Sequence, residues 1–254
     1  MTNTLIVGNW KMNNAVPESL MLVAGLEAHI KQSPNVDVVV APTFTSLYSV
    51  GIAIADSGIK LAAQDIFWEE KGAYTGEISG TFLKDVGCEY VIIGHSERRK
   101  YFGEINETVN KKIYAALRNA LIPIVCVGET LAEREGGKTF DVLEKQVKSA
   151  VAGFQPKDFE HFAVAYEPVW AIGTGKNATE EQIEESHKFI RNMLAKLYDA
   201  PTANNIQLLY GGSVKASNCK DIYKQPNVNG LLVGGASLDA KGFADIVAQA
   251  PGQK

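Results

Sequence analysis

The sequence predicts an α/β protein in which eight strand–helix units close into one (β/α)8 barrel. Short runs rich in Val, Ile and Leu recur eight times along the 254 residues, and longer segments with helical spacing separate them. Several runs show no polar alternation, which is typical of strands covered on both faces in a parallel sheet. Strands that alternate with helices favour right-handed crossovers, and eight such units favour a closed barrel. A doubly wound open sheet is the alternative.

The expected strands lie at residues 5–7, 36–40, 59–62, 90–93, 122–127, 162–165, 206–210 and 230–233. Apolar residues recur at helical spacing in residues 17–31, 107–119, 140–151 and 179–198. The last of these segments opens with Thr179-Glu180-Glu181-Gln182, a capping box that satisfies free amides at a helix start. No Gly/Ser-rich linker interrupts the chain, so we expect residues 1–254 to form a single domain.

Composition excludes several classes of protein. Hydrophobic residues make up 46% of the chain and charged residues 21%, which is typical of a globular fold. A net charge of −4 argues against a general nucleic-acid binder. Cys88, Cys126 and Cys219 are too scattered for a disulfide framework, and Cys126 within a strand is expected to be a buried thiol. The sequence shows no signal peptide and no stretch near the ~18 apolar residues of a membrane span, so we expect a cytoplasmic location.

The connection from Gln64 to Ser79 is unusually long and carries the aromatic residues Phe67, Trp68 and Tyr74. Long loops in compact domains are usually functional. The segment therefore predicts an interface. A loop folded onto its own barrel is the alternative.

Polar residues follow most of the expected strands, and in a barrel the chemistry lies at the carboxyl ends of the strands. These strand ends carry Asn9, Lys11, Gln64, Asp65, His95, Glu97, Glu129 and Glu167. Of the four histidines, His95 alone directly ends a strand. A metal centre needs about three protein ligands, so we expect none here.

Four carboxylates, Asp65, Glu97, Glu129 and Glu167, are candidates for a general base, and spacing alone does not choose among them. Glu167 differs because it opens the segment 168–176, where a proline is followed by small apolar residues and two glycines. This composition predicts a lid that closes over Glu167 and excludes water. An ordinary surface loop is the alternative.

Two sets of glycines predict a phosphate site. Gly211-Gly212-Ser213 follows the seventh strand, and Gly234-Gly235 follows the eighth. Amides without neighbouring side chains can approach a phosphate closely, and a short helix after Gly235 would add its positive end. Barrels often bind phosphate with these two loops. Neither GxxxxGK[ST] nor GxGxxG after the first strand is present, so no nucleotide cofactor is indicated.

Five motifs, in order from the first strand to the last, resemble those of triosephosphate isomerases. They are residues 9–13 (NWKMN), 94–99 (GHSERR), 165–176 (AYEPVWAIGTGK), 210–214 (YGGSV) and 230–238 (GLLVGGASL). The segment Thr75-Gly76-Glu77-Ile78-Ser79 is similar to the interface loop of the same family. The resemblance implies a single-domain TIM barrel that interconverts dihydroxyacetone phosphate and D-glyceraldehyde 3-phosphate without a cofactor, in glycolysis and gluconeogenesis.

The resemblance also implies the role of each site residue. Glu167 is the expected base, and His95 is the expected electrophile, acting as a neutral imidazole at a helix N-terminus. Lys11 and Asn9 are expected to stabilise the phosphate and the developing oxyanion, with Glu97 in support. The phosphate is expected on Gly173, Ser213, Gly234 and Gly235. A homodimer is implied, formed through the loop around Tyr74–Glu77.

Three other functions fit parts of the sequence. A Schiff-base aldolase needs a lysine at a strand end, and Lys11 is the clear candidate, although its neighbours fit charge stabilisation better. A retaining glycosidase needs two close carboxylates, but the glycine-lined anion site argues against it. A non-catalytic barrel has no physical need for Asn9, Lys11, His95 and Glu167 together.

Overall fold

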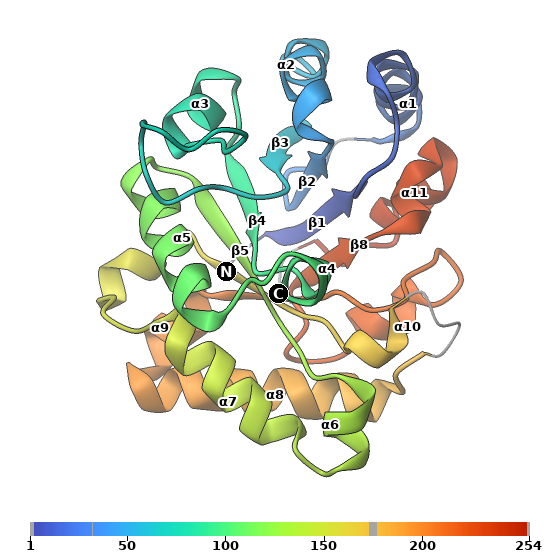
Figure 1. Cartoon of the computed structure of the whole chain (residues 1–254). Coiled ribbons are helices and arrows are strands. Elements are labelled where there is room, and N and C mark those ends of the chain that lie inside the picture. Colours follow the sequence, from blue (N-terminus) through green and yellow to red (C-terminus); the bar gives the residue numbers. More distant parts are fainter. Residues whose placement is uncertain (1–2, 32, 173–176, 253–254) are drawn as a thin grey trace.

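The computed structural model describes residues 3–31, 33–172 and 177–252. Its eight strands are β1 (Thr4–Asn9), β2 (Val36–Ala41), β3 (Lys60–Ala63), β4 (Tyr90–Ile93), β5 (Ile122–Val127), β6 (Ala163–Tyr166), β7 (Gln207–Tyr210) and β8 (Gly230–Val233). Each strand pairs in parallel with the next, and β8 pairs with β1, so the sheet closes. The predicted (β/α)8 barrel is confirmed, and the open-sheet alternative is wrong. Figure 1 looks along the barrel, with the strands inside the ring of helices.

The outer layer consists of helices that follow the strands. They are α1 (Val16–His29), α2 (Phe44–Ala53), α3 (Gly80–Asp85), α4 (Ser96–Tyr101), α5 (Asn106–Arg118), α6 (Leu131–Glu135), α7 (Thr139–Ala150), α8 (Glu180–Leu197), α9 (Ala200–Asn205), α10 (Cys219–Tyr223) and α11 (Ala240–Val247). Short 3-10 turns occur at η1 (Pro156–Phe159), η2 (Val169–Ala171) and η3 (Gly235–Leu238). The predicted capping box is confirmed, because the Thr179 hydroxyl accepts the Gln182 amide.

Three strands begin one residue later than predicted. Ile59, Phe162 and Ile206 were expected within strands, but β3, β6 and β7 start just after them. All three side chains are buried in the layer between barrel and helices. An apolar residue just before a strand therefore contributes to the same core as the strand, and hydrophobicity alone does not separate the two.

The molecule has two hydrophobic cores. One fills the barrel with side chains that alternate along the strands: Leu5, Val7, Val39, Ala41, Ala62, Tyr90, Ile92, Ile124, Cys126, Ala163, Ala165, Leu209 and Leu232. The larger core lies between the barrel and the helices. As predicted, Cys126 is buried, and burial raises the pKa of its thiol well above the ordinary value. The packed interior gives the strand ends a rigid base.

The long loop after β3 is partly folded onto its own barrel. The Phe67 ring packs against Trp68 and Tyr74, with centroids 4.2 and 4.8 Å apart. Arg118 of α5 donates to the Trp68 carbonyl and pairs with Glu70. Residues 71–77, however, are exposed. The alternative of a loop folded onto its own barrel therefore holds at the base of this loop and does not hold at its tip.

His187 is a buried histidine in α8, and its environment favours the neutral form. Its Nδ1 lies 2.8 Å from the Ile183 carbonyl oxygen, and its ring packs edge-on against Tyr166. Burial lowers the pKa of His187 to about 4. The unfolded chain binds a proton at this histidine with a pKa of about 6.5. Between those two values the unfolded state therefore holds more protons than the folded state.

We expect the free energy of unfolding to fall by about 3 kcal/mol between pH 6.5 and pH 4 because of His187. The stabilisation is fully present above pH 6.5 and decreases as the pH falls. Urea unfolding of the wild type and of His187→Asn at pH 7 and pH 4.5 measures the difference in slope. His161→Asn, which changes an exposed histidine, is the control. Equal pH slopes for all three proteins would contradict this assignment.

Candidate active site

A cavity of about 500 Å³ opens at the carboxyl ends of the strands. It is lined by Asn9, Lys11, His95, Glu167, Ile172, Gly211, Gly212, Ser213, Val214, Lys215, Leu232, Gly234, Gly235 and Ala236. Seven of the predicted catalytic and phosphate-binding residues are in this set. The predicted Gly173, with the lid residues 174–176, lies outside the described residues. The structure therefore brings together residues from β1, β4, β6, β7 and β8.

His95 lies at the start of α4, where the chain turns sharply out of β4. Gly94 has φ 72°, a left-handed conformation that glycine adopts without strain. His95 is the N-cap of α4, and its Nδ1 accepts the backbone N–H of Glu97 at 3.2 Å. The neutral imidazole then carries its proton on Nε2, the nitrogen that points toward Glu167.

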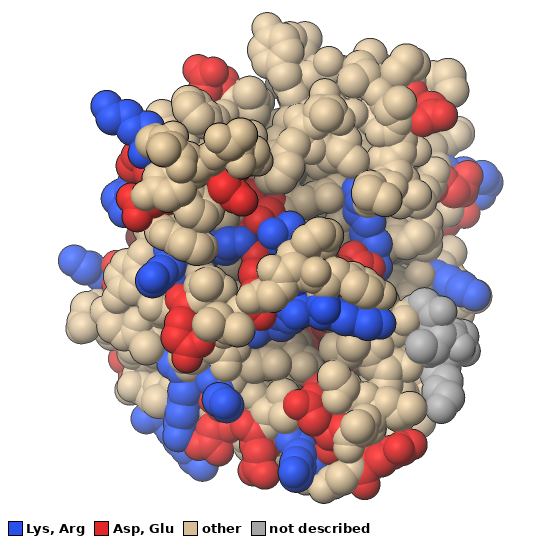
Figure 2. All heavy atoms as spheres, in the orientation of Figure 1, with Lys and Arg blue, Asp and Glu red and all other residues tan. Residues whose placement is uncertain are grey.

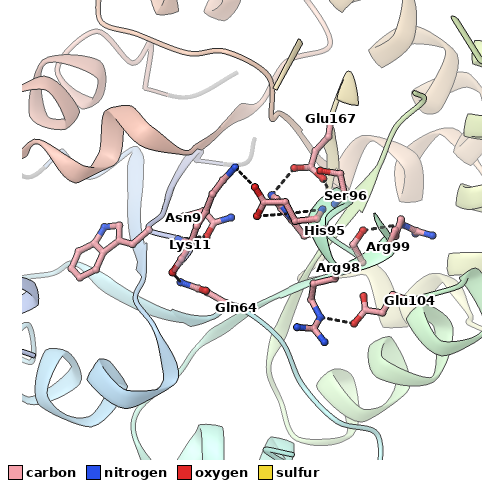
Figure 3. A network of polar contacts seen from close by, with 12 residues as sticks. Asn9, Lys11, Gln64, His95, Ser96, Arg98, Arg99, Glu104 and Glu167 are labelled. Carbon is pink, nitrogen blue, oxygen red and sulfur yellow. Dashed lines mark hydrogen bonds and ion pairs between the residues drawn. The ribbon is translucent and has the colours of Figure 1, made fainter. Parts of the chain in front are cut away.

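Glu167 is fully buried at the end of β6 and contacts the same helix start (Figure 3). Its Oε1 lies 2.9 Å from His95 Nε2, and its Oε2 accepts the Ser96 amide at 3.0 Å. Burial by itself raises the pKa of Glu167, but the charge and hydrogen bond of His95 and the Ser96 amide lower it more. The net pKa is below the ordinary value, so the carboxylate is ionised at neutral pH.

The pKa of His95 moves in the opposite direction from the one that the family resemblance implies. Burial lowers this pKa, whereas the charge and hydrogen bond of Glu167, with a contribution from Glu97, raise it more. The net direction is upward. The cause of this rise is the Glu167 carboxylate, which is in direct contact with the ring. The neutral imidazole that the family resemblance implies stays a prediction.

Lys11 reaches the cavity from the end of β1. Its Nζ lies 2.6 Å from Glu97 Oε1, and Glu97 Oε2 lies 3.5 Å from His95 Nδ1. Its backbone N–H donates to Asn9 Oδ1 at 3.0 Å. Glu97 thus lies between the lysine and the histidine and contacts both, and its supporting role stays a prediction.

The glycine-rich part of the cavity lies opposite, after β7 and β8. The short helix expected after Gly235 is present as η3. A Cβ on Gly234 would lie 3.4 Å from Lys11 Cε, which is an ordinary van der Waals distance, so the lysine side chain lies beside the Gly234 backbone. Lys215 and Leu232 also line the cavity, and our sequence analysis missed both. The position of Lys215, two residues after Gly-Gly-Ser, was a usable signal.

The other two candidate bases, Asp65 and Glu129, form ion pairs and hydrogen bonds outside the cavity. Asp65 pairs with Arg98 at 2.9 Å and with Lys112 at 2.6 Å, and burial raises its pKa to about 6. Glu129 is also buried, and its Oε1 accepts hydrogen bonds from Tyr166, Trp170 and Arg134. Neither residue lines the cavity. Of the four carboxylates, only Glu167 lines this cavity, and Glu97 reaches it through its contacts with Lys11 and His95.

Charges elsewhere on this face are mixed. In Figure 2, Lys and Arg side chains are interspersed with Asp and Glu, and much of the face is uncharged. Within the described ranges, no group of three or more His, Cys, Asp or Glu side chains is arranged to hold a metal ion. No helix in those ranges is long and apolar enough to cross a membrane.

The geometry around Glu167 depends on a glycine at the end of β5. A Cβ on Gly128 would lie 1.7 Å from the Glu167 carbonyl oxygen, so Gly128→Ala forces one backbone segment to move. We expect a loss of stability of about 1–3 kcal/mol and a displaced carboxylate. Thermal unfolding and turnover of the substrate that the family resemblance implies measure both effects. The control is Gly136→Ala, where the nearest atom lies 3.1 Å from the added carbon. Unchanged turnover in Gly128→Ala would contradict the expectation.

Comparison with known proteins is consistent with this site. The family model described as triosephosphate isomerase matches residues 4–250. The chain is 53% identical to the triosephosphate isomerase of Geotalea uraniireducens over 247 residues, which cover 97% of this chain and 98% of the relative. Relatives of the same name from Citrifermentans bemidjiense and Moorella thermoacetica are 52% and 53% identical, with the same coverage. The chain therefore belongs to the triosephosphate isomerase family.

Proposed function

We propose that Glu167, His95, Lys11 and Asn9 carry out the reaction of this family, the interconversion of dihydroxyacetone phosphate and D-glyceraldehyde 3-phosphate. The observation that carries the proposal is the 2.9 Å contact between the Glu167 carboxylate and His95 Nε2 beside a cavity with a glycine-rich rim. Proton transfer at a carbon next to a carbonyl requires a base for the carbon-bound proton and an N–H donor for the carbonyl oxygen, and here the two groups lie side by side. Residues 1–254 act as one catalytic domain in this proposal.

The phosphate binds at the glycine-rich rim. Ser213, Gly234 and Gly235 line this part of the cavity together with Lys11. In this proposal their backbone amides bind the phosphate oxygens, and the Lys11 ammonium supplies positive charge. We include Gly173 because of its place in the family motif. Binding energy from the phosphate then acts on the reacting carbons through orientation of the substrate.

The substrate carbons bind between Glu167 and His95. Glu167 removes a proton from the carbon next to the carbonyl and returns it to the neighbouring carbon. His95 donates its Nε2 proton to the carbonyl oxygen and recovers a proton from the adjacent hydroxyl. Lys11 and Asn9 stabilise the negative charge that develops on the enediolate oxygens. No net proton or electron is gained or lost in this sequence.

Binding of the substrate raises the pKa of Glu167 and so makes its carboxylate a stronger base. The groups that lower the pKa of Glu167 include the His95 ring and the Ser96 amide, which the carboxylate contacts directly. A carboxylate that turns from these partners toward the substrate loses both hydrogen bonds, whereas burial, which raises its pKa, remains. The carboxylate is then a stronger base at the moment when it takes the proton.

The aldolase alternative is not supported by the surroundings of Lys11. A Schiff-base lysine attacks as a free amine and is activated by desolvation or by a neighbouring cation. Lys11 instead forms an ion pair with Glu97 at 2.6 Å, and its side chain is 27% exposed. These surroundings suit a lysine that acts as a fixed positive charge.

The chain is further proposed to act as a homodimer in the cytoplasm, within glycolysis and gluconeogenesis. A second cavity of about 340 Å³ shares Lys11 and His95 with the first, and its lining, in which most residues are polar, also includes Met12, Phe44 and Phe102. These three apolar side chains are exposed, Met12 to 93%. Exposed apolar patches indicate partner surfaces. We propose that the loop tip around Tyr74–Glu77 of a second copy covers this patch.

Removal of the base should abolish turnover. In a coupled assay of D-glyceraldehyde 3-phosphate isomerisation, we expect Glu167→Ala to lower kcat by a factor of about 10²–10⁴, the usual contribution of a general base. Glu144→Ala, which removes an exposed carboxylate on α7, should leave kcat unchanged. Fast turnover by Glu167→Ala would refute this assignment, and Glu97 would then be the next candidate.

The interface proposal predicts a dimer mass in sedimentation at micromolar protein. Tyr74→Asp places a charge at the proposed contact and should shift the mass toward the monomer with a parallel loss of activity. Leu131→Asp is the control, because this residue is comparably exposed at the start of α6, on another side of the barrel (Figure 1). A fully active monomer in the wild type would rule out the proposal.

A further inference from the structure

The end of β3 supplies none of the proposed catalytic residues, yet Gln64 directly after it contacts two other strand ends. The Gln64 side-chain amide donates to the Lys11 carbonyl oxygen at 2.7 Å and to the Ala41 carbonyl oxygen at 2.9 Å. Both hydrogens of the amide group are thus used. Figure 3 shows Gln64 beneath Lys11.

Lys11 has an unusual backbone conformation that needs such support. Its φ is 53°, in the left-handed region that residues with a side chain rarely adopt. Strained conformations of this kind persist where the surrounding contacts hold them in place. Here the Lys11 N–H donates to Asn9 Oδ1 and the Lys11 carbonyl accepts from Gln64. The lysine backbone is therefore fixed at both ends.

The same short segment also fixes the opposite side of the site. Asp65, the residue after Gln64, pairs with Arg98 of α4 at 2.9 Å. The preceding residue of α4 is Glu97, which holds the Lys11 ammonium at 2.6 Å. Gln64 and Asp65 thus connect the Lys11 backbone to the helix that receives the Lys11 side chain.

We propose that Gln64 is a positioning residue for the reaction, because its amide holds Lys11 in the left-handed conformation that places the ammonium in the cavity. The inference rests on the proposed role of Lys11. Gln64 does not line the main cavity, so it acts through the lysine. When the amide is lost, the Lys11 peptide can relax toward an ordinary conformation, and the ammonium moves with it.

Two substitutions remove the donor in different ways. Gln64→Met keeps the length of the side chain and removes its polar group. Gln64→Glu keeps the shape but sets a carboxylate oxygen against the two carbonyl oxygens. The matched control is Gln207→Met at the start of β7, at the other end of the barrel. The Gln207 amide likewise donates to a backbone carbonyl, that of Asn3, at 2.8 Å. Circular dichroism and thermal unfolding of each variant check that it folds.

The decisive measurement is kcat/KM for each substitution in two backgrounds, wild type and Lys11→Met. In the wild-type background we expect Gln64→Met to lower kcat/KM by about 10- to 100-fold, the cost of a misplaced catalytic group. Gln64→Glu should lower it at least as much, and Gln207→Met should change it less than about twofold. In the Lys11→Met background we expect Gln64→Met to cost less than about twofold, because the group that it positions is absent.

Three results would overturn the inference. One is Gln64→Met with wild-type kcat/KM, and another is an equal loss in both backgrounds, which is the behaviour of a merely structural residue. The third is full activity in Lys11→Met alone, which would also refute the proposed role of Lys11. The first two results, obtained with a Lys11→Met variant whose kcat/KM is strongly lowered but still measurable, leave that role intact, so the two failures are distinguishable.

Discussion

The contact between the Glu167 carboxylate and the His95 imidazole determines how the rest of the site is arranged. The two residues come from β6 and β4, so the loop after β5 must pass between their strands without filling the space. Gly128 makes this passage possible, since any side chain there would collide with the Glu167 backbone. The start of α4 then completes the contact, because its Ser96 amide binds the carboxylate and its Glu97 amide fixes the ring. One pair of side chains thus depends on three consecutive strand ends.

The rim is organised by charge pairing. Of the four acids at the strand ends, Asp65 and Glu129 are neutralised by cations from the surrounding helices, namely Lys112, Arg98 and Arg134. Glu97 forms an ion pair with Lys11, and Glu167 contacts His95, whose side chain is titratable. Asp65 and Glu129 thus have fixed cations as partners and lie outside the cavity, whereas Glu167 has a titratable partner and lines the cavity. Location in the cavity, together with the type of partner, distinguishes the proposed base from the other two acids.

The sequence was sufficient for the barrel and for most of the residues predicted in the cavity, although not for Lys215 and Leu232, because strand order and strand ends follow from position along the chain. Strands that are covered on both faces appear in the sequence as uninterrupted apolar runs, and the residues just after each strand lie at the same rim of the barrel. Position along the chain does not show which side chains pair with one another across the rim. Asp65 and Glu167 look alike in sequence, and only the contacts of Asp65 with Lys112 and Arg98 set them apart. The rise in the pKa of His95 depends on its contacts with Glu167 and Glu97, and the hydrogen bond of Gln64 to Lys11 depends on the backbone conformation of that distant residue.

The left-handed backbone of Lys11 has a consequence for the engineering of this chain. At that φ, glycine is the residue with the least strain, so stability and the role that we propose for the ammonium favour different residues at the same position. A library selected only for resistance to heat would tend to collect glycine at position 11 and discard the ammonium. The backbone conformation at position 11 therefore sets stability against the lysine side chain. A stabilised variant of this protein keeps the lysine only if the selection also measures turnover.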